Sequence, residues 1–156
     1  MAKYRRLLKE ELVIFEKEFV DFLVVNGIVA EDWEKLKVNE PEKAEKMVDL
    51  FSDVILESVM RKAQFLEIHT ANYVQGVQCL ADKMIMIAVN CKDQKQDMRL
   101  FMKESPKELW KDEYEILQGE KKYAESREMD IFNMTKQGFS ITDGELFKEL
   151  MIATVK

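Results

Sequence analysis

Apolar residues recur three and four positions apart in the first part of the chain, which is the spacing of one helix face. Between residues 5 and 25 this pattern predicts a single amphipathic helix. Asn26 and Gly27 follow it, and Gly27 is expected to take the left-handed conformation that ends many helices. A short helix around Trp33 and Leu36 is expected next. The apolar positions of the first helix are Leu8, Leu12, Phe15, Phe19, Phe22 and Leu23.

The segment 40–66 is predicted to be the central helix of the fold. Asn39 is the expected N-cap, and Pro41 suits the first turn, where its missing N–H is not needed. Apolar residues cover most of the helix circumference, so the helix is expected to be buried on several sides. These residues are Leu50, Phe51, Val54, Ile55, Leu56, Val59 and Met60. The pattern leaves open whether residues 67–72 end this helix or begin a strand.

Two segments in the middle of the chain predict a β-hairpin. Residues 73–80 alternate imperfectly between apolar and polar, and residues 84–91 are apolar enough for a strand covered on both faces. Ala81 and Asp82 suit a tight turn between them. A two-stranded ribbon is marginal in water. Either residues 139–141 add a third strand, therefore, or a second copy of the chain pairs with an edge and forms a homodimer.

Two capping boxes predict helices in the last third of the chain. Residues 105–108 (Ser-Pro-Lys-Glu) open a helix that could run to Gln137, with Gly138 as its stop. Gly119 could divide this segment, so 105–137 could be one helix or two. Residues 142–145 (Thr-Asp-Gly-Glu) open a final helix. That helix is expected to bury Leu146, Phe147 and Leu150.

These elements together predict a helix-rich α+β fold in which a small antiparallel hairpin or sheet packs against the central buried helix. The chain has 156 residues, of which 47% are hydrophobic, and this is enough to bury a core. No linker, low-complexity tract or internal repeat interrupts the sequence. Residues 1–156 are therefore expected to form a single domain.

The charge balance bears on the partners that the protein could have. Thirty acidic residues outnumber 24 basic ones, giving a net charge of −6. This balance argues against binding to nucleic acid or to an anionic membrane surface, both of which need an excess of Lys and Arg. Charged residues begin at once at the N-terminus, and the longest apolar run, Met84–Val89, is far too short to span a bilayer.

The two cysteines indicate a reducing compartment. In the predicted hairpin Cys79 faces the region of Met84, while Cys91 lies seven residues further along. At about 3.3 Å per strand residue the two sulfur atoms are too far apart to bond. The sequence therefore predicts a cytoplasmic protein with free thiols.

Motifs for catalysis and cofactor binding are missing from the sequence. The five glycines are scattered, and G-x-S-x-G, C-x-x-C and H-E-x-x-H do not occur. Glu67 and His69 would share a strand face, but two ligands are too few for a metal site. No cofactor and no metal are expected, and the pattern favours a protein that is not an enzyme.

The best enzymatic grouping in the sequence combines Asp53, Glu57 and His69. The two acids lie four positions apart on one helix face, and paired carboxylates can tune each other's pKa for acid–base work. His69 could approach them only if the chain folds back. The alternative, which the pattern favours, is a solvated stripe in which the acids form salt bridges with Arg61 and Lys62 one turn further on.

The stretch 111–128 is predicted to be a mixed-charge helix with aromatic residues interleaved. Its simplest interpretation is one face packed on the core and the rest solvated. Trp, Tyr and Arg are also the residues that anchor interfaces, so Trp110, Tyr114, Tyr123 and Arg127 are candidate partner-binding residues. The ten methionines are expected to fill the core, and an adaptable Met-lined groove is the alternative.

Several segments together resemble a known family. They are Lys3–Leu7, Phe51–Asp53, Met84–Val89, Asp130–Phe132, Gln137–Gly138 and Ile141–Leu146. They are similar to small uncharacterised proteins of Bacteroidota, a domain of unknown function designated DUF6495. The resemblance extends over nearly the whole chain and implies one domain of a cytoplasmic bacterial protein. It implies no activity, cofactor or catalytic residue.

Two hypotheses about function follow from these observations. The leading one is a non-catalytic interaction protein that acts as a homodimer or as an adaptor for an unknown protein partner. The alternative is a small-ligand-binding or enzymatic domain. In that case a pocket would lie between the central helix and the sheet, with Asp53, Glu57 and His69 near its mouth.

Overall fold

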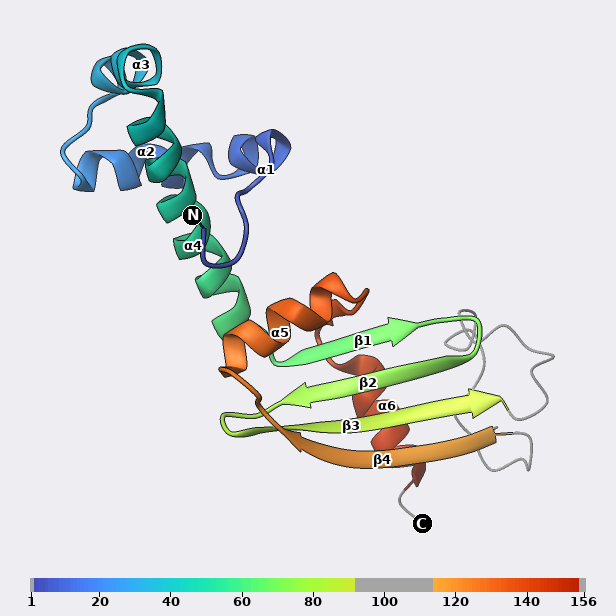
Figure 1. The fold of residues 1–156 in the computed structure, drawn as a ribbon. Helices are drawn as coiled ribbons and strands as arrows, with labels where there is room; N and C mark the ends of the chain where they lie inside the picture. Colours follow the sequence, from blue (N-terminus) through green and yellow to red (C-terminus); the bar gives the residue numbers. More distant parts are fainter. Residues whose placement is uncertain (1, 92–113, 155–156) are drawn as a thin grey trace. The chain divides into compact units, whose positions relative to one another are not determined.

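The computed structural model describes residues 2–91 and 114–154 (Figure 1). The chain forms two compact units, Met1–Val59 and Met60–Lys156, which we call the helical unit and the sheet unit. The boundary between them falls inside one long helix. That residues 1–156 fold as a single domain stays a prediction.

The helical unit contains α1 (Lys9–Ile14), α2 (Glu16–Val25), α3 (Ala30–Asn39) and most of α4 (Pro41–Lys62). The prediction of one helix over residues 5–25 is wrong. Phe15 interrupts it, because its φ of −99° and ψ of 23° leave the helical region. The chain before Lys9 is extended and bound to α4, as described below, so it is not free to continue the helix.

The predicted stop of α2 is confirmed. Gly27 has a φ of +79°, and its N–H donates to the carbonyl of Val24 at 2.9 Å. The N–H of Ile28 donates to the carbonyl of Leu23 at 2.8 Å, which completes the glycine-dependent cap. The short helix expected around Trp33 is also confirmed as α3.

The start of α4 differs by one residue from the prediction. Pro41 is its first residue, as expected for a helix opened by proline. The predicted N-cap, Asn39, instead ends α3. The carbonyl of Glu40 accepts the N–H groups of Lys43 and Ala44, both at 3.1 Å, so Glu40 occupies the capping position.

The core of the helical unit is centred on Phe51, which is 1% exposed. Its ring lies 4.9 Å from that of Phe19 and 5.4 Å from that of Phe22, measured between centroids. The expected burial of α4 on several sides is wrong, because Leu50 and Val54 are 54% and 55% exposed. Within this unit α2 packs against the Phe51 side of α4 and leaves the Leu50 and Val54 side uncovered.

The sheet unit is built on a five-stranded antiparallel sheet in the order β4-β3-β2-β1-β5. The strands are β1 (Phe65–His69), β2 (Tyr73–Cys79), β3 (Lys83–Cys91), β4 (Tyr114–Lys122) and β5 (Ser140–Thr142). The helix-rich α+β fold with an antiparallel sheet is thus confirmed. The open question at residues 67–72 is also answered, since residues 67–69 belong to β1.

The predicted hairpin is confirmed as β2 and β3, with Ala81 and Asp82 in the turn that joins them. The N–H of Leu80 donates to the carbonyl of Lys83 at 2.9 Å across this turn. Cys79 lies opposite Met84 as expected, and it is a free, buried thiol. Residues 140–142 form a strand within the chain, as one of the two alternatives expected, but this strand pairs with β1. The hairpin itself is flanked by β1 and β4.

The helix predicted over 111–128 is wrong for residues 114–122. Residues 114–122 form β4, because all nine pair with β3. A separate helix, α5 (Arg127–Lys136), follows and has Ser126 as its N-cap. Its stop at Gly138, with a φ of +111°, is confirmed. The capping box at 105–108 lies outside the described residues.

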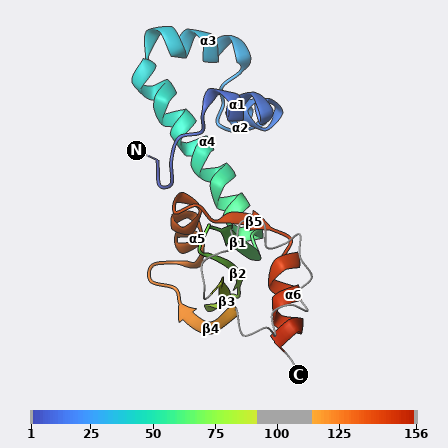
Figure 2. The ribbon, with the colours of Figure 1, turned by 90° about the vertical axis from the view of Figure 1, so that its right-hand side faces the viewer.

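Helices cover both faces of the sheet, with α5 on one face and α6 (Glu145–Thr154) on the other (Figure 2). The α6 residues Leu146, Phe147 and Leu150 are buried, as predicted. They form a cluster with Phe65, Val74, Ile87, Val89 and Tyr114 from the strands. Gly76 of β2 allows this close packing, because a Cβ there would lie 3.1 Å from the Cα of Phe147.

The second capping box opens a helix, though not through the predicted hydrogen bonds. α6 begins at Glu145, so Thr142 is too far upstream to be its N-cap. The hydroxyl of Thr142 accepts the N–H of Gly144 at 3.1 Å, and the carboxylate of Asp143 accepts the N–H of Glu145 at 3.1 Å. Each side chain therefore stabilises the turn before the helix.

Candidate functional site

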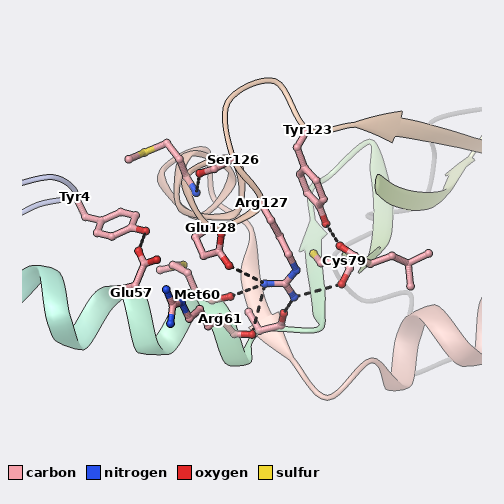
Figure 3. Close-up of polar contacts among 12 residues, drawn as sticks. Tyr4, Glu57, Met60, Arg61, Cys79, Tyr123, Ser126, Arg127 and Glu128 are labelled. Atoms are coloured by element: carbon pink, nitrogen blue, oxygen red, sulfur yellow. Dashed lines mark hydrogen bonds and ion pairs between the residues drawn. The ribbon is translucent and has the colours of Figure 1, made fainter. Parts of the chain in front are cut away.

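The two acids proposed for acid–base chemistry hold the N-terminal segment of the chain. The carboxylate of Asp53 accepts the backbone N–H of Lys3 at 2.8 Å and that of Tyr4 at 3.1 Å. Glu57 accepts a hydrogen bond from the hydroxyl of Tyr4 (Figure 3), and the ammonium of Lys3 lies 3.4 Å from the same carboxylate. These contacts give both acids a structural role.

The same side of α4 binds the next residues of the N-terminal segment. The hydroxyl of Ser52, fully buried, accepts the N–H of Leu7 at 2.9 Å and donates to the carbonyl of Val48 at 2.7 Å. The guanidinium of Arg6 donates two hydrogen bonds to Asp49, at 2.7 and 3.2 Å, and thereby lowers the pKa of that carboxyl. Two of the segments that carry the family resemblance, 3–7 and 51–53, thus bind each other.

His69, the third catalytic candidate, lies in the sheet unit. Its Nε2 is 2.5 Å from Oε2 of Glu67, so the two side chains share a strand face as expected. Its Nδ1 is buried without a hydrogen-bond partner among the described residues. Within the same part of the chain, no three His, Cys, Asp or Glu side chains are grouped to hold a metal ion. A catalytic role for Asp53, Glu57 and His69 stays a prediction.

The aromatic partner-binding candidates lie in different surroundings. Trp110 is outside the described residues. Tyr114 is 6% exposed and belongs to the core under α6. Tyr123 donates its hydroxyl proton to the carbonyl of Leu80 at 2.6 Å, and burial raises its pKa to about 12. Tyr114 therefore contributes to packing, and Tyr123 joins the end of β4 to the β2–β3 turn.

Arg127 binds backbone carbonyls from two elements of the sheet unit (Figure 3). Its guanidinium donates to the carbonyls of Met60 at 3.0 Å, Arg61 at 3.5 Å, Cys79 at 3.3 Å, and Ala63. Three of these follow or end α4, where carbonyls lack helical partners and favour a cation. Sequence spacing could not reveal this role, because the acceptors are 48 to 67 positions away.

Cys79 and Asp130 are two further buried titratable residues of the sheet unit. Burial raises the pKa of the Cys79 thiol to about 11, which makes it a poor nucleophile at neutral pH. Asp130 is 8% exposed, and its carboxylate accepts the N–H groups of Ala124 at 2.6 Å and Glu125 at 3.2 Å. Asp130 thus holds the connection between β4 and α5.

The helical unit contains a cavity of about 310 Å³ between α2 and α3, which we call the α2–α3 groove. Its walls are mostly apolar, and the rings of Phe19 and Trp33 meet edge to face at 5.2 Å and 84°. The lining residues are Glu16, Phe19, Val20, Leu23, Ile28, Ala30, Trp33 and Glu34. An apolar cavity lined also by two acids suits a ligand that combines an apolar group with a nearby positive charge.

The sheet unit contains a cavity of about 420 Å³ between α5 and the sheet, the α5–sheet cavity. Three methionines and two aromatic rings supply its apolar surface: Met84, Met86, Met134, Tyr73 and Phe139. Side-chain amides of Gln75, Asn133 and Gln137 supply hydrogen-bonding groups. This mixture is typical of small-molecule sites.

These features define a two-unit α+β protein with an apolar groove in one unit and a sheet-side cavity in the other. The chain belongs to the family of unknown function DUF6495, whose model matches residues 1–154, and the resemblance found in the sequence is confirmed. No curated protein and no solved structure shows significant similarity to it. Across residues 2–91 and 114–154, no helix is long and apolar enough to cross a membrane.

Proposed function

We propose that this protein is a non-catalytic adaptor whose α2–α3 groove binds an apolar anchor residue in a basic segment of a partner protein. The observation that carries the proposal is the exposure of apolar side chains at the groove. Val20 lines the groove and is 46% exposed, and Val24, on the same face of α2, is 55% exposed. Contiguous exposed apolar surface marks interaction sites.

The walls of the groove favour a large apolar anchor. Trp33 and Phe19 form one rigid aromatic corner, and aromatic residues dominate the binding energy of many interfaces. A volume of about 310 Å³ can admit a side chain of the size of Leu, Phe or Met. The partner segment is therefore expected to carry such a residue, most simply on an amphipathic helix laid along α2.

The charge of the two helices determines the chemistry expected beside the anchor. Residues 16–39 contain six acidic and three basic side chains. At the rim Glu34 is already paired with Lys37 at 3.1 Å, whereas Glu16 is exposed. A Lys or Arg of the partner next to the anchor would meet Glu16 and gain from the acidic field as it approaches.

The test is selection of peptides from a random displayed library on the immobilised full-length protein. Enriched sequences should combine a large apolar residue with Lys or Arg within one helical turn. Val20→Asp and Val24→Asp should each weaken binding of the enriched peptide at least tenfold. The matched control is Val38→Asp on α3, since Val38 is 80% exposed and does not line the groove. That variant should bind within twofold of the wild type.

Circular dichroism of all three variants shows whether the helical content is retained. No enrichment at all, or an enriched peptide that binds Val20→Asp as tightly as the wild type, contradicts the proposal. Enrichment of acidic peptides would also contradict it, because the charges at the groove would then be misassigned.

A second candidate function, small-ligand binding, is supported by the α5–sheet cavity. Its methionines and aromatic rings, together with its side-chain amides, suit a small compound that has both apolar surface and hydrogen-bonding groups. Ligand-observed NMR with a fragment library should find compounds that bind the wild type. The same compounds should not bind Met86→Trp, because Met86 lines the cavity and the larger side chain would fill it. Binders that persist in that variant, or an absence of binders, would argue against a ligand site there.

A further inference from the structure

Strand β4 forms one end of the sheet and is long for an edge strand. All nine of its residues pair with β3 on one side. On its other side no strand from the described part of the chain is paired with it. Every second residue there offers its N–H and C=O outward, and such an edge can be extended by another strand.

We propose that β4 pairs antiparallel with β4 of a second copy of this chain, across a two-fold axis at Gln118. Residues directly opposite each other in an antiparallel pair point to the same face of the sheet. A two-fold axis perpendicular to the sheet must therefore pass midway between the two copies of one residue. Gln118 is the middle residue of β4 (Tyr114–Lys122), so this register pairs all nine residues. The result is a continuous ten-stranded sheet. The inference is independent of the α2–α3 groove.

This register also pairs charges of opposite sign. Glu115 lies opposite Lys121 of the second copy, and the symmetry produces the same pair a second time. Opposite charges directly across an antiparallel ladder stabilise it. Within its own chain each of the two side chains lies across from an uncharged residue, because Glu115 pairs with Asn90 and Lys121 with Met84.

The same register places an exposed apolar side chain opposite a glycine, which has no side chain of its own. Leu117 is 51% exposed and would lie across from Gly119 of the second copy. A Cβ built at Gly119 meets no atom within 4 Å, so the space beside it is open. Leu117 could extend over that glycine, and the contact would cover one of the few large apolar side chains that the described sheet unit exposes.

Neighbouring registers lack these features. With the axis at Gly119, Lys121 faces Leu117 of the second copy. With the axis at Glu120, that acid faces its own copy, and like charges directly opposite each other destabilise a ladder. With the axis at Leu117, Glu115 faces a glycine. The full overlap of β4 and the pairing of charges therefore coincide at Gln118.

Sedimentation velocity of the full-length protein at several concentrations tests the proposal. The wild type should sediment as a dimer of twice 18.4 kDa. Glu115→Lys and Lys121→Glu should each raise the dimer dissociation constant at least tenfold, because each places like charges opposite one another. The double variant should return within threefold of the wild type. Lys122→Glu changes charge equally but faces Tyr114 of the second copy, so it should change the constant less than threefold.

Mixing the two single variants gives the sharper result. One copy of each restores both opposite-charge pairs, so two variants that each dimerise weakly alone should form a heterodimer with about the affinity of the wild type. A wild type that stays monomeric over a 100-fold range of concentrations, up to its solubility limit, overturns the proposal. So does a dimer that both single variants leave intact, or a mixture that stays monomeric.

Discussion

The two units of this protein differ in how well they cover their own apolar residues. Among the described residues, fourteen large hydrophobic side chains are more than a third exposed. Eleven of them lie in the helical unit, although it is the smaller of the two. The sheet unit exposes three, namely Leu117, Ile141 and Ile152.

The difference follows from architecture. In the sheet unit each face of one sheet is covered by a helix, so apolar residues pointing either way are buried. In the helical unit three helices of six to ten residues pack on part of a longer one. Short helices cannot surround it, and a small unit buries a smaller share of its surface. The sheet unit is therefore expected to supply stability and the helical unit to supply binding surface.

The largest expected effect comes from the centre of the helical unit. Phe51→Ala removes a fully buried ring and should cost about 4 kcal/mol. Such a loss should unfold this unit first, because Phe51 packs against both Phe19 and Phe22 at the centre of its core. Hydrogen exchange should show fast exchange at α2 and α3 and retained protection in β2 and β3.

The matched control for that variant is Leu50→Ala, one position away and 54% exposed. It should cost below about 1 kcal/mol, since an exposed side chain loses little on truncation. Equal loss of protection in both units after Phe51→Ala would contradict the expected difference in stability between them. It would mean that the two units unfold as one cooperative structure.

Arg127 gives the corresponding test in the sheet unit. Arg127→Ala leaves carbonyls of Met60, Ala63 and Cys79 without their donor and should cost about 3 kcal/mol. Arg127→Lys keeps the charge but not the planar fork, so it should recover less than half of that loss. Urea denaturation measures both. Lys122→Ala on the exposed end of β4 is the control, and a loss below about 1 kcal/mol for Arg127→Ala would contradict the assigned role.

Local patterns were sufficient wherever the structure depends on neighbours in sequence. The sequence predicts the β2–β3 hairpin and the stops at Gly27 and Gly138, because turns and caps are made by residues close together. A strand near Ile141 is one of two alternatives that the sequence leaves open. The α+β class followed from them. The buried face of α6 was also predicted from its spacing.

Long-range pairing explains what the sequence did not show. Tyr114 and Leu117 are three positions apart and suggest a helix, but nine ladder pairs with β3 outweigh that local preference. The sequence indicates the stripe of acids on α4 but not the segment that binds it, because Lys3 and Tyr4 lie 49 to 54 positions away from these acids. A partner-binding role for Arg127 stays a prediction, whereas the carbonyls that it binds lie 48 to 67 positions away and could not be found from sequence spacing.

Two glycines with positive φ, one in each unit, allow the packing density of the two units to be compared. At Gly144, with φ +86°, a Cβ would overlap the ring of Phe65, whereas at Gly27, with φ +79°, it would meet no atom within 4 Å. Gly144→Ala should therefore cost about 3 kcal/mol, from strain and overlap together. Gly27→Ala should cost about 1 kcal/mol, from strain alone. Equal losses in thermal or urea unfolding would indicate that the sheet unit can shift Phe65 without cost.

The smallest expected effects are opposite responses to pH. In the helical unit the guanidinium of Arg5 and the N–H of Leu8 lower the pKa of Glu11 to about 2, from an ordinary value of 4.5. A lowered pKa gives stability that is present above pH 4.5 and is lost as the pH falls toward 2. Glu11→Gln should remove this acid-dependent loss, measured as the change in melting temperature between pH 5 and pH 2.

In the sheet unit burial raises the pKa of Cys79 from 9.0 to about 11 and that of Tyr123 from 10.0 to about 12. Both groups bind protons more tightly in the folded state, so their stabilisation is complete below pH 9 and is lost between about pH 9 and pH 12. Tyr123→Phe should lower the melting temperature slightly at pH 8, because Leu80 loses a hydrogen bond, and should flatten its decline above pH 10. If the decline above pH 10 is as steep in that variant as in the wild type, Tyr123 does not titrate with folding. The alkaline sensitivity would then have to come from Cys79, and Cys79→Ala should flatten it instead.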